Sequence, residues 1–538
     1  MDFTLTTADL PLPTAFSSHD AYYGVHVLTT TDAKVYTFRV YAPNAQSVSL
    51  VSGFFSWDNG KRMTKAMGGV WEITFPFDRS LEGECYKYKL TTDEGVFYIT
   101  DPFAKREEGR GGRASLVATE IASAKTDTPW QEMPKVAQPL HVLEVSLASF
   151  YTKDNRLPYE ESAACHYREL AEKLVIYLKS TNYTHVKLLP RVPSEDTSYF
   201  APSPRYGTPS DFAAFVDTLH QNGVGVILSF YYPKTPYQSA LLLSASEYFL
   251  AHYALDGIAF EANDADIPEI VIAFLEKTAA WKARFPDAYF FCDRVAHKSF
   301  LHITAERDTG REDVFSELLI APPDQRGDKL IPLTEALISE KRFASQSKEL
   351  TRGGKNSLME AFYGSYEQKF AANRLYQTLL TVAKGCKLSF MMQSLAPFRP
   401  WQDHLLPEWY MADFKLHRAH RRFVRALNRL HLETPLLFRS DTRIELTHLD
   451  RENAIFSLKL TGRDGELIAV FNCSDTLAAD YPLTVSGSDF DECFSSDEER
   501  YAGEGYVHRI TLRAENGRIK LDLAPLTAVL LQPSGCKS

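Results

Sequence analysis

Residues 167–190, YRELAEKLVIYLKSTNYTHVKLLP, combine an amphipathic helix with a short apolar strand. Apolar residues recur at helical spacing through YRELAEKLVIYLK, and the apolar run HVKLLP follows after a short polar break. A helix that leads into a buried strand in this way is the repeating unit of a parallel α/β sheet. The stretch therefore predicts an α/β domain around it.

The same alternation continues on both sides of this unit. Further apolar strands are predicted at 141–147, 224–230, 256–262, 288–294 and 387–394, and further amphipathic helices at 211–223 and 366–384. Crossovers of this regularity are typical of an open α/β sheet or of a closed barrel. We predict a (β/α)8 TIM barrel over residues 136–432.

The segments on either side of the barrel alternate with period two instead. Residues 31–100 predict an N-terminal β-sandwich over 21–120, with an extension at 1–20 before it and a polar linker at 121–135 after it. Short alternating strands after residue 432 predict a C-terminal antiparallel β-sandwich over 433–538. The expected fold class is multidomain, α/β plus all-β.

Composition narrows the kinds of partner. The chain has 538 residues and a net charge of −10, and it has no long run of Lys or Arg, so neither nucleic acid nor a membrane surface is an expected partner. It begins without a signal peptide and contains no apolar run long enough to span a bilayer, which predicts a cytoplasmic protein. Seven scattered cysteines without metal-type spacing predict free thiols.

Several stretches, in this order along the chain, resemble those of one enzyme family. They are FRVYAPNAQSVSLV (38–51), SWDNGKRMTKAMGGVWE (56–72), YRELAEKLVIYLKSTNYTHVKLLP (167–190), YFAPSPRYGTPSDFAAFVDTLHQNGVGVIL (199–228), SLMEAFYGSYEQKFAANRLYQ (357–377) and NCSDTLAADYPL (472–483). The family is the bacterial 1,4-α-glucan branching enzymes of glycoside hydrolase family 13, which carry a carbohydrate-binding module of family 48 in front. The resemblance covers the chain nearly end to end.

The resemblance implies a retaining mechanism in which two carboxylic residues act on the glycosidic bond and a third stabilises the transition state. The family has Asp at the end of strand 4, Glu at the end of strand 5 and Asp after strand 7. This chain has Glu261, Asp293 and Glu349 at those positions, so each acid is replaced by the other carboxylic residue. Acidity is kept, but the reach of each side chain changes.

Other family positions are also replaced, and the loops around the cleft are shorter. The strand-4 Arg corresponds to Ala259, the Asp and His after strand 3 to Ser229 and Lys234, the His before the strand-7 acid to Lys348, and the Asn-Glu pair after strand 8 to Gln393-Ser394. We therefore expect a catalytically inactive homologue, a pseudoenzyme. The alternative is an altered but active branching enzyme or α-glucan hydrolase, in which one longer and one shorter side chain conserve a carboxylate gap of about 5–5.5 Å.

Three basic residues lie in the sequence near the same strand ends, namely Lys234, Arg294 and Lys348. Carboxylates that lie close together cannot all remain charged unless positive groups compensate them. We expect a salt-bridge cluster that neutralises the barrel mouth, with Lys234 or Lys348 within about 4 Å of a site carboxylate. Alternation turns Arg294 toward the opposite side from Asp293.

The N-terminal module keeps residues that the resemblance assigns to glucan binding. Trp57 matches a stacking aromatic, Lys87 matches a binding lysine, and Phe97 or Tyr98 falls near the second aromatic. Alternation places Phe97 and Tyr98 on opposite faces of a strand, so only one of them can stack on a sugar.

Acidic residues after strand 4, namely Asp264, Asp266 and Glu269, do not have the spacing of a calcium loop, and we expect no metal and no cofactor. Three hypotheses about function remain. The chain is an inactive α-glucan-binding regulator or scaffold beside an active paralogous enzyme of glycogen or starch metabolism, an altered active enzyme, or a structural partner protein without glucan binding.

Overall fold

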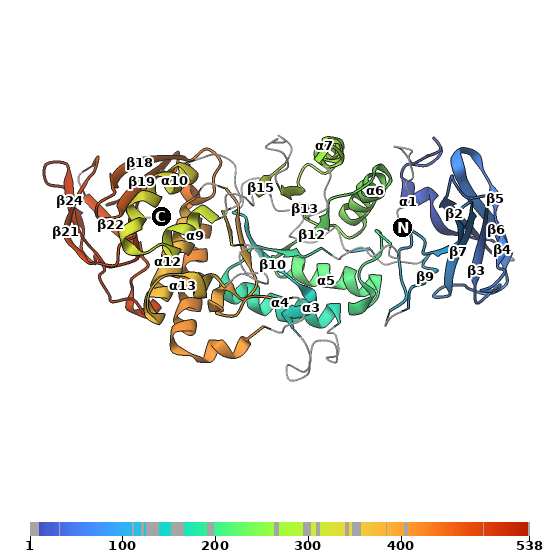
Figure 1. Ribbon diagram of the computed structural model, residues 1–538, viewed down its shortest axis with the longest axis horizontal. Coiled ribbons are helices and arrows are strands. Elements are labelled where there is room, and N and C mark those ends of the chain that lie inside the picture. Colours follow the sequence, from blue (N-terminus) through green and yellow to red (C-terminus); the bar gives the residue numbers. More distant parts are fainter. Residues whose placement is uncertain are drawn as a thin grey trace.

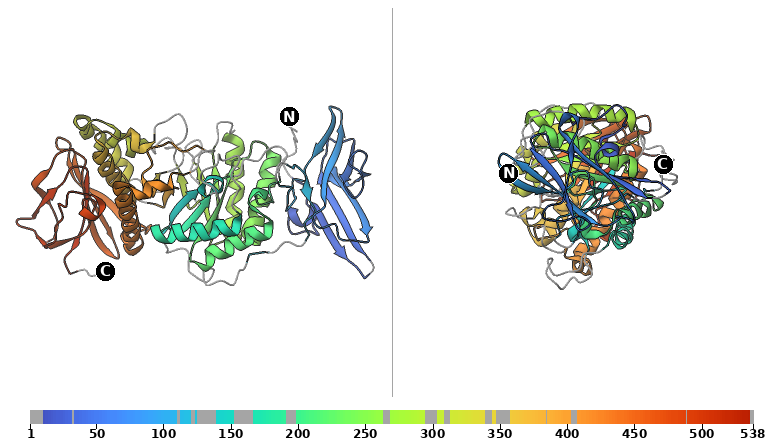
Figure 2. Two further views of the ribbon diagram at one scale, coloured as in Figure 1. Left: turned by 90° about the horizontal axis from the view of Figure 1, so that it is seen from below. Right: turned by 90° about the vertical axis from the view of Figure 1, so that its right-hand side faces the viewer.

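In the computed structural model the chain forms three parts in a row, with the N-terminal β domain at one end, the α/β domain in the middle and the C-terminal β domain at the other end (Figure 1). The same order is visible along the long axis in the left-hand view of Figure 2. The structure describes residues 10–31, 33–109, 112–119, 123–124, 139–151, 166–190, 198–262, 268–293, 303–307, 313–338, 344–346, 357–383, 385–402, 407–487 and 489–535. The predicted linker, 121–135, lies almost entirely outside these residues.

The N-terminal domain is a sandwich of two antiparallel sheets. One sheet has the order β1-β2-β6-β5, formed by Gly24–Thr29, Lys34–Tyr41, Val70–Phe77 and Thr64–Lys65. The other has the order β4-β3-β7-β8, formed by Lys61–Arg62, Ser47–Ser52, Cys85–Thr92 and Gly95–Ile99, with β9 (Ser115–Leu116) also paired to β7. Aromatic residues of alternate positions, including Phe38, Phe75 and Tyr86, fill the space between the sheets.

The central domain contains a parallel sheet of eight strands. In chain order the strands are β10 (His141–Val145), β11 (His185–Leu188), β12 (Gly225–Tyr231), β13 (Gly257–Glu261), β14 (Tyr289–Asp293), β15 (Ala305–Arg307), β16 (Ala344–Gln346) and β17 (Lys387–Phe390). The sheet order is β15-β14-β13-β12-β11-β10-β17-β16. If β10 is counted as the first barrel strand, neighbouring strands follow the order 6-5-4-3-2-1-8-7. This is the circular strand order of a (β/α)8 barrel, which confirms the predicted architecture.

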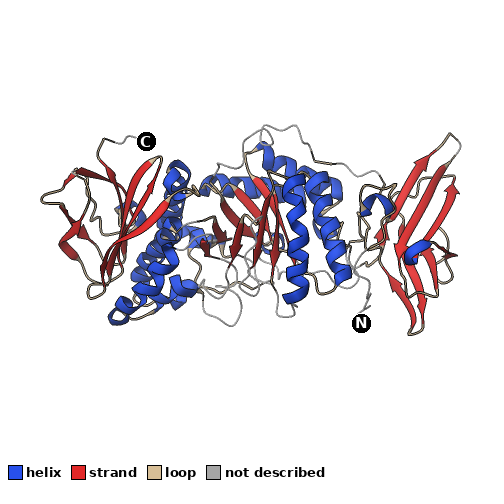
Figure 3. Cartoon of the chain, turned by 90° about the horizontal axis from the view of Figure 1, so that it is seen from above, coloured by secondary structure: helices blue, strands red, loops and turns tan. Residues whose placement is uncertain are grey.

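Helices surround these strands, and Figure 3 shows them on both sides of the central sheet. They are α3 (Leu147–Phe150), α4 (Tyr167–Thr181), α5 (Pro209–Gln221), α6 (Pro236–His252), α7 (Pro268–Lys277), α8 (Trp281–Arg284), α9 (Asp313–Ile320), α10 (Arg326–Ile338), α11 (Leu358–Ala361), α12 (Tyr366–Val382) and α13 (Lys415–Glu433), and a short α1 (His19–Tyr22) precedes the sandwich. Sequence signals set several of their ends. Thr208 and Asp211 form a capping box at the start of α5, and Asn182 ends α4 in the left-handed region.

The C-terminal domain is also built from antiparallel strands. Its larger sheet has the order β18-β19-β20-β25-β22-β23, formed by Arg443–Asp450, Ile455–Gly462, Gly465–Asn472, Thr527–Pro533, Asp489–Ser495 and Leu512–Arg513. A smaller sheet pairs β21 (Ala478–Thr484) with β24 (Arg518–Leu523). The two sheets enclose a separate apolar core, as the alternating sequence predicts.

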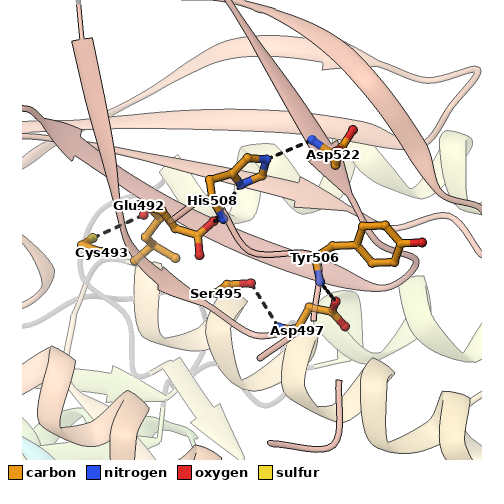
Figure 4. Close-up of polar contacts among 8 residues, drawn as sticks. Glu492, Cys493, Ser495, Asp497, Tyr506, His508 and Asp522 are labelled. Carbon is orange, nitrogen blue, oxygen red and sulfur yellow. Dashed lines mark hydrogen bonds and ion pairs between the residues drawn. The ribbon is translucent and has the colours of Figure 1, made fainter. Parts of the chain in front are cut away.

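Polar side chains fix the long connection between β22 and β23 (Figure 4). The Asp497 carboxylate accepts the backbone N–H groups of Glu504 and Tyr506 at 3.0 Å each. The His508 ring accepts the backbone N–H of Asp522 at Nε2, 3.0 Å away, so its Nδ1 carries the proton and donates to Glu492 Oε2 at 2.8 Å. The connection lies outside the sheet, so its backbone N–H groups have no neighbouring strand to bond to. Side chains accept several of these N–H groups instead.

No helix in the part of the chain that the structure describes is both long and apolar enough to cross a membrane.

The N-terminal end of the barrel holds a group of buried basic side chains. His141 of β10 and Lys387 of β17 are register partners, and the rings of His141 and His431 lie 5.4 Å apart. Burial lowers the pKa of His141 to about 3, lowers that of Lys387 to about 7, and holds that of His431 well below its usual value.

Because His141 and His431 are buried, we predict that the folded chain loses stability in mild acid. The pKa values of His141 and His431 are depressed in the folded chain, so the unfolded chain binds more protons once the pH falls below about 6.5. Their contribution to the free energy of unfolding is complete above pH 6.5. It should fall by about 1.4 kcal/mol per pH unit for each histidine between roughly pH 6 and pH 4.

Urea unfolding at several pH values between 7 and 4 measures this slope. The slope of the free energy of unfolding against pH reports the number of protons that the chain takes up when it unfolds. The double substitution His141→Gln, His431→Gln should lower that number by about two, whatever its effect on stability at pH 7. His166→Gln, which removes a histidine at an exposed position, is the matched control. A double variant with the slope of the parent chain would show that these histidines do not titrate on unfolding.

Candidate active site

Alternation along the strands decides which side chains lie inside the barrel. A small apolar cluster of residues from several barrel strands, including Val142, Ile227, Ala259, Phe291 and Leu388, fills the interior. Two positions further along four of those strands come polar residues on the same inner side, near the carboxyl ends of the strands. They are Glu144, Ser229, Glu261 and Asp293, and all four are buried.

A buried lysine joins two of these carboxylates. Lys187 of β11 donates from Nζ to Glu144 Oε1 at 2.7 Å and to Glu261 Oε1 at 2.6 Å. The Lys187 side chain is 6% exposed, and the two glutamates are 0% and 2% exposed. One ammonium group therefore contacts two carboxylates where water has little access, and we call these three residues the mouth triad.

The path of Lys187 depends on short side chains beside it. β12 lies between β11 and β13, so a link from Lys187 to Glu261 passes the inner face of β12. Ser229 of β12 and Ala259 of β13 are register partners, and both are small. Large side chains at these two positions would occupy the space between the Lys187 ammonium group and Glu261.

Asp293 is held by a different set of contacts. Its Oδ2 accepts the backbone N–H of Ala262 at 2.7 Å, and its carbonyl oxygen accepts the hydroxyl of Tyr232. The backbone N–H of Tyr232 in turn donates to the carbonyl of Glu261 at 3.1 Å. Asp293 therefore fixes the backbone that leaves β13, next to the mouth triad.

The structure places a basic residue at the mouth that was not predicted from the sequence. Lys187 lies on the inner face of β11 and contacts the Glu144 and Glu261 carboxylates. Lys234 lies beyond the end of β12, in the loop before α6; it is exposed and makes no ion pair with a described residue. Arg294, Lys348 and Glu349 lie outside the described residues, so their predicted roles are untested.

Glu144 and Lys187 were not predicted as site residues, although both have a recognisable signal in the sequence. Each is a charged residue inside a short apolar strand, in HVLEV and HVKLL. Such a residue is almost never fully buried without a partner. Two of them on neighbouring strands indicate an ion pair inside the barrel.

The described residues contain no group of three or more His, Cys, Asp or Glu side chains that could hold a metal ion. Of the acidic residues considered for calcium, Asp264 and Asp266 lie outside the described residues.

A second polar surface lies on the outer face of the β4-β3-β7-β8 sheet. Trp57 and Tyr98 are 43% and 45% exposed. Tyr98 is the register partner of Lys89, whose Nζ lies 5.7 Å from the Tyr98 ring centroid and donates to the Asp58 carbonyl at 2.6 Å. Lys87 lies two residues before Lys89 and so points to the same face.

The register also separates Phe97 from Tyr98. Phe97 pairs with Leu90, which lies in the sandwich core, whereas Tyr98 pairs on the outer face. Of these two aromatics, Tyr98 is the one that lies on the same face as Lys87 and Lys89.

Comparisons with known proteins agree with the motifs read from the sequence. Residues 22–104 match Carbohydrate-binding module 48 (Isoamylase N-terminal domain). The chain is 28% identical to a 1,4-alpha-glucan branching enzyme of Pseudomonas aeruginosa, over 93% of this chain and 80% of the relative. It is 27% identical to one of Streptomyces avermitilis, over 92% of this chain and 98% of the relative. The resemblance to branching enzymes thus extends over most of the chain.

Solved structures support the same fold. The catalytic module of a glycogen-degrading pneumococcal virulence factor superposes with a TM-score of 0.72 at 14% identity, over 96% of this chain and 98% of that module. A pullulanase from Bacillus acidopullulyticus gives a TM-score of 0.70 at 12% identity, over 97% of this chain and 76% of the other.

The mouth triad predicts a strong effect of one substitution. Lys187→Met would leave the Glu144 and Glu261 carboxylates buried without their shared cation. Breaking a buried ion pair from one side costs about 3–5 kcal/mol, so chemical unfolding should show a loss of that order. Lys234→Met, the matched control at an exposed lysine, should change stability by less than about 0.5 kcal/mol. Equal effects of the two substitutions would contradict the assignment of Lys187.

Proposed function

We propose that this chain is a branching-enzyme-like protein of glycogen or starch metabolism that binds α-glucan and lacks branching activity. The observation that carries the proposal is the contact between Lys187 Nζ and Glu261 Oε1 at 2.6 Å inside the barrel. We place the protein in the cytoplasm, beside an active paralogous enzyme that supplies or uses the same glucan. Its role there is that of a regulator or scaffold.

The mouth triad argues against catalysis by Glu261. A retaining nucleophile must bring a free carboxylate oxygen to the anomeric carbon of the sugar. Glu261 is 2% exposed, and an attack would require it to leave a buried ion pair. Separating such a pair without replacing the partner is costly.

Asp293 is equally poorly suited to the role of general acid. A general acid has to reach the departing oxygen with its carboxyl group. The Asp293 carboxylate is 4% exposed, and its Oδ2 accepts the backbone N–H of Ala262 at 2.7 Å, so this oxygen is already engaged inside the barrel. Ala259, where the resemblance places an arginine, removes a further charged group from the reacting centre.

Glucan binding is assigned to the outer face of the N-terminal sandwich. Pyranose rings stack on flat aromatic side chains, and Tyr98 is exposed there opposite Lys89. Lys89 Nζ donates to the carbonyl of Asp58, the residue that follows the exposed Trp57. The lysines of this face are donors for sugar hydroxyl groups. The match of residues 22–104 to a carbohydrate-binding module supports this assignment.

Incubation of the purified chain with amylose tests the loss of activity. We expect no change in the iodine spectrum and no new α-1,6 linkages above background, because neither carboxylate is free to act. Losing both the nucleophile and the acid should cost far more than the roughly 10²–10⁴ that proton transfer alone contributes. New linkages formed within about tenfold of the rate of an ordinary branching enzyme would favour the altered active enzyme instead.

Affinity electrophoresis in a glycogen-containing gel tests the binding face. Trp57→Ala should weaken glycogen binding by about tenfold and leave the melting temperature nearly unchanged, because the ring is 43% exposed. Tyr506→Ala, an exposed aromatic in the C-terminal domain, is the matched control and should keep full binding. If Trp57→Ala unfolds the domain, or if the parent chain does not bind glycogen, the binding face is assigned wrongly.

A further inference from the structure

The last helix of the barrel, α13, exposes a continuous row of cations. Lys415, Arg418, Arg422, Arg425 and Arg429 are all exposed, and they follow one another at spacings of three, four, three and four residues. At 3.6 residues per turn and 1.5 Å per residue, this spacing keeps the five side chains on one face over about 21 Å. We call these five residues the α13 cationic row.

Other side chains of α13 pack against the protein, and this packing fixes the direction in which the α13 cationic row points. Phe423, Val424 and Leu427 lie in the apolar core that the barrel shares with the C-terminal domain. The Asn428 side chain donates to the Thr181 carbonyl of α4 at 2.7 Å, and Arg421, next to the row, donates to Ser180 Oγ at 2.9 Å. The helix cannot rotate to bury its cations without breaking these contacts.

Little negative charge on the chain compensates the row. Arg429 pairs with Glu433 at 2.8 Å, and Arg418 donates to the backbone carbonyls of Ala412 and Asp413. Lys415, Arg422 and Arg425 make no ion pair with any described residue. Like charges three and four residues apart destabilise a helix. In a chain whose net charge is −10, the row is therefore an uncompensated positive stripe on an acidic molecule.

We propose that the α13 cationic row binds an acidic α-helix of a partner protein, in which Asp and Glu recur at the same alternating spacing of three and four residues. That spacing would keep the acidic side chains of the partner on one helical face, opposite the five cations. A flexible polyanion has no need of such a regular row. The proposal is independent of glucan binding and of the barrel mouth.

The surroundings of the row have the composition of a protein interface. Four of its five cations are arginines, which are enriched at interfaces, whereas lysine is depleted there. Next to its first residue lie two exposed aromatics, Phe414 at 55% and Tyr410 at 57% exposure, with ring centroids 6.4 Å apart. An acidic helix with an apolar end would contact both the cations and these rings.

Two synthetic helical peptides of 21 residues test the proposal. Both are rich in alanine and have the same number of glutamates, which lie on one face at the alternating spacing in the first and are spread around the helix in the second. We expect the full chain to bind the first peptide at least about tenfold more tightly, measured by fluorescence anisotropy, because several exposed ion pairs form together. Raising the salt concentration should weaken this binding.

Charge reversal locates the binding site. Arg422→Glu with Arg425→Glu should abolish the preference for the first peptide. Arg513→Glu with Arg518→Glu, at two exposed arginines of the C-terminal domain, makes the same change in net charge and should keep the preference. Circular dichroism on both variants checks that the fold is retained.

The proposal fails if neither peptide binds, if both bind equally, or if reversal at Arg422 and Arg425 has no effect. Polyphosphate is the third probe. If it binds more tightly than the first peptide and competes with it, the row is a general polyanion site and the acidic-helix proposal is overturned.

Discussion

One ammonium group between two carboxylates determines what the barrel interior can accommodate. Lys187 lies 2.7 Å from Glu144 and 2.6 Å from Glu261, and none of the three is more than 6% exposed. Removing Lys187 would leave both carboxylates buried without the ammonium group that they share. The neighbouring strands are consistent with this arrangement, because Ser229 and Ala259 are short where the lysine passes.

The fold could largely be predicted from the sequence, and the exceptions have a physical reason. Periodicity identified strands such as 141–147 and helices such as 366–384, because burial of one face repeats locally along the chain. It did not single out β15 (Ala305–Arg307) or β16 (Ala344–Gln346), since three residues are too few to show a period. The number of strands in the barrel was predicted from the regular alternation of the other strands and helices.

The site was harder to predict from the sequence than the fold, because ion pairs depend on which strands are neighbours in space. Glu261 was identified from its place at a strand end, but its partner Lys187 is 74 residues away. Lys234 was chosen because it is close in sequence to a strand end, and it proves to be exposed. The choice between Phe97 and Tyr98 likewise needed the register of β7 with β8, which assigns Phe97 to the core side.

The C-terminal domain is held to the barrel by arginines that bind backbone carbonyls. Arg374 of α12 is buried and donates to the carbonyls of Ser496 at 2.8 Å and Tyr501 at 3.2 Å, and Arg326 donates to that of Cys473 at 3.0 Å. Burial lowers the pKa of Arg374 to about 10, while the nearby Asp497 carboxylate opposes this shift. A guanidinium group satisfied in this way ties the connection after β22 firmly to α12. Because α13 contacts both α12 and this connection, the same contacts hold α13 in place.

The two outer surfaces lie far apart on the same molecule. The sandwich face with Trp57 and Tyr98 belongs to the domain at one end of the long axis, and α13 lies toward the other end (Figure 1). A glucan chain on the sandwich and an acidic helix on α13 would therefore not compete for space. Neither interaction requires Glu261 or Asp293 to leave its buried contacts. The two surfaces proposed for binding are therefore separated by the barrel, and neither depends on the acids at its mouth.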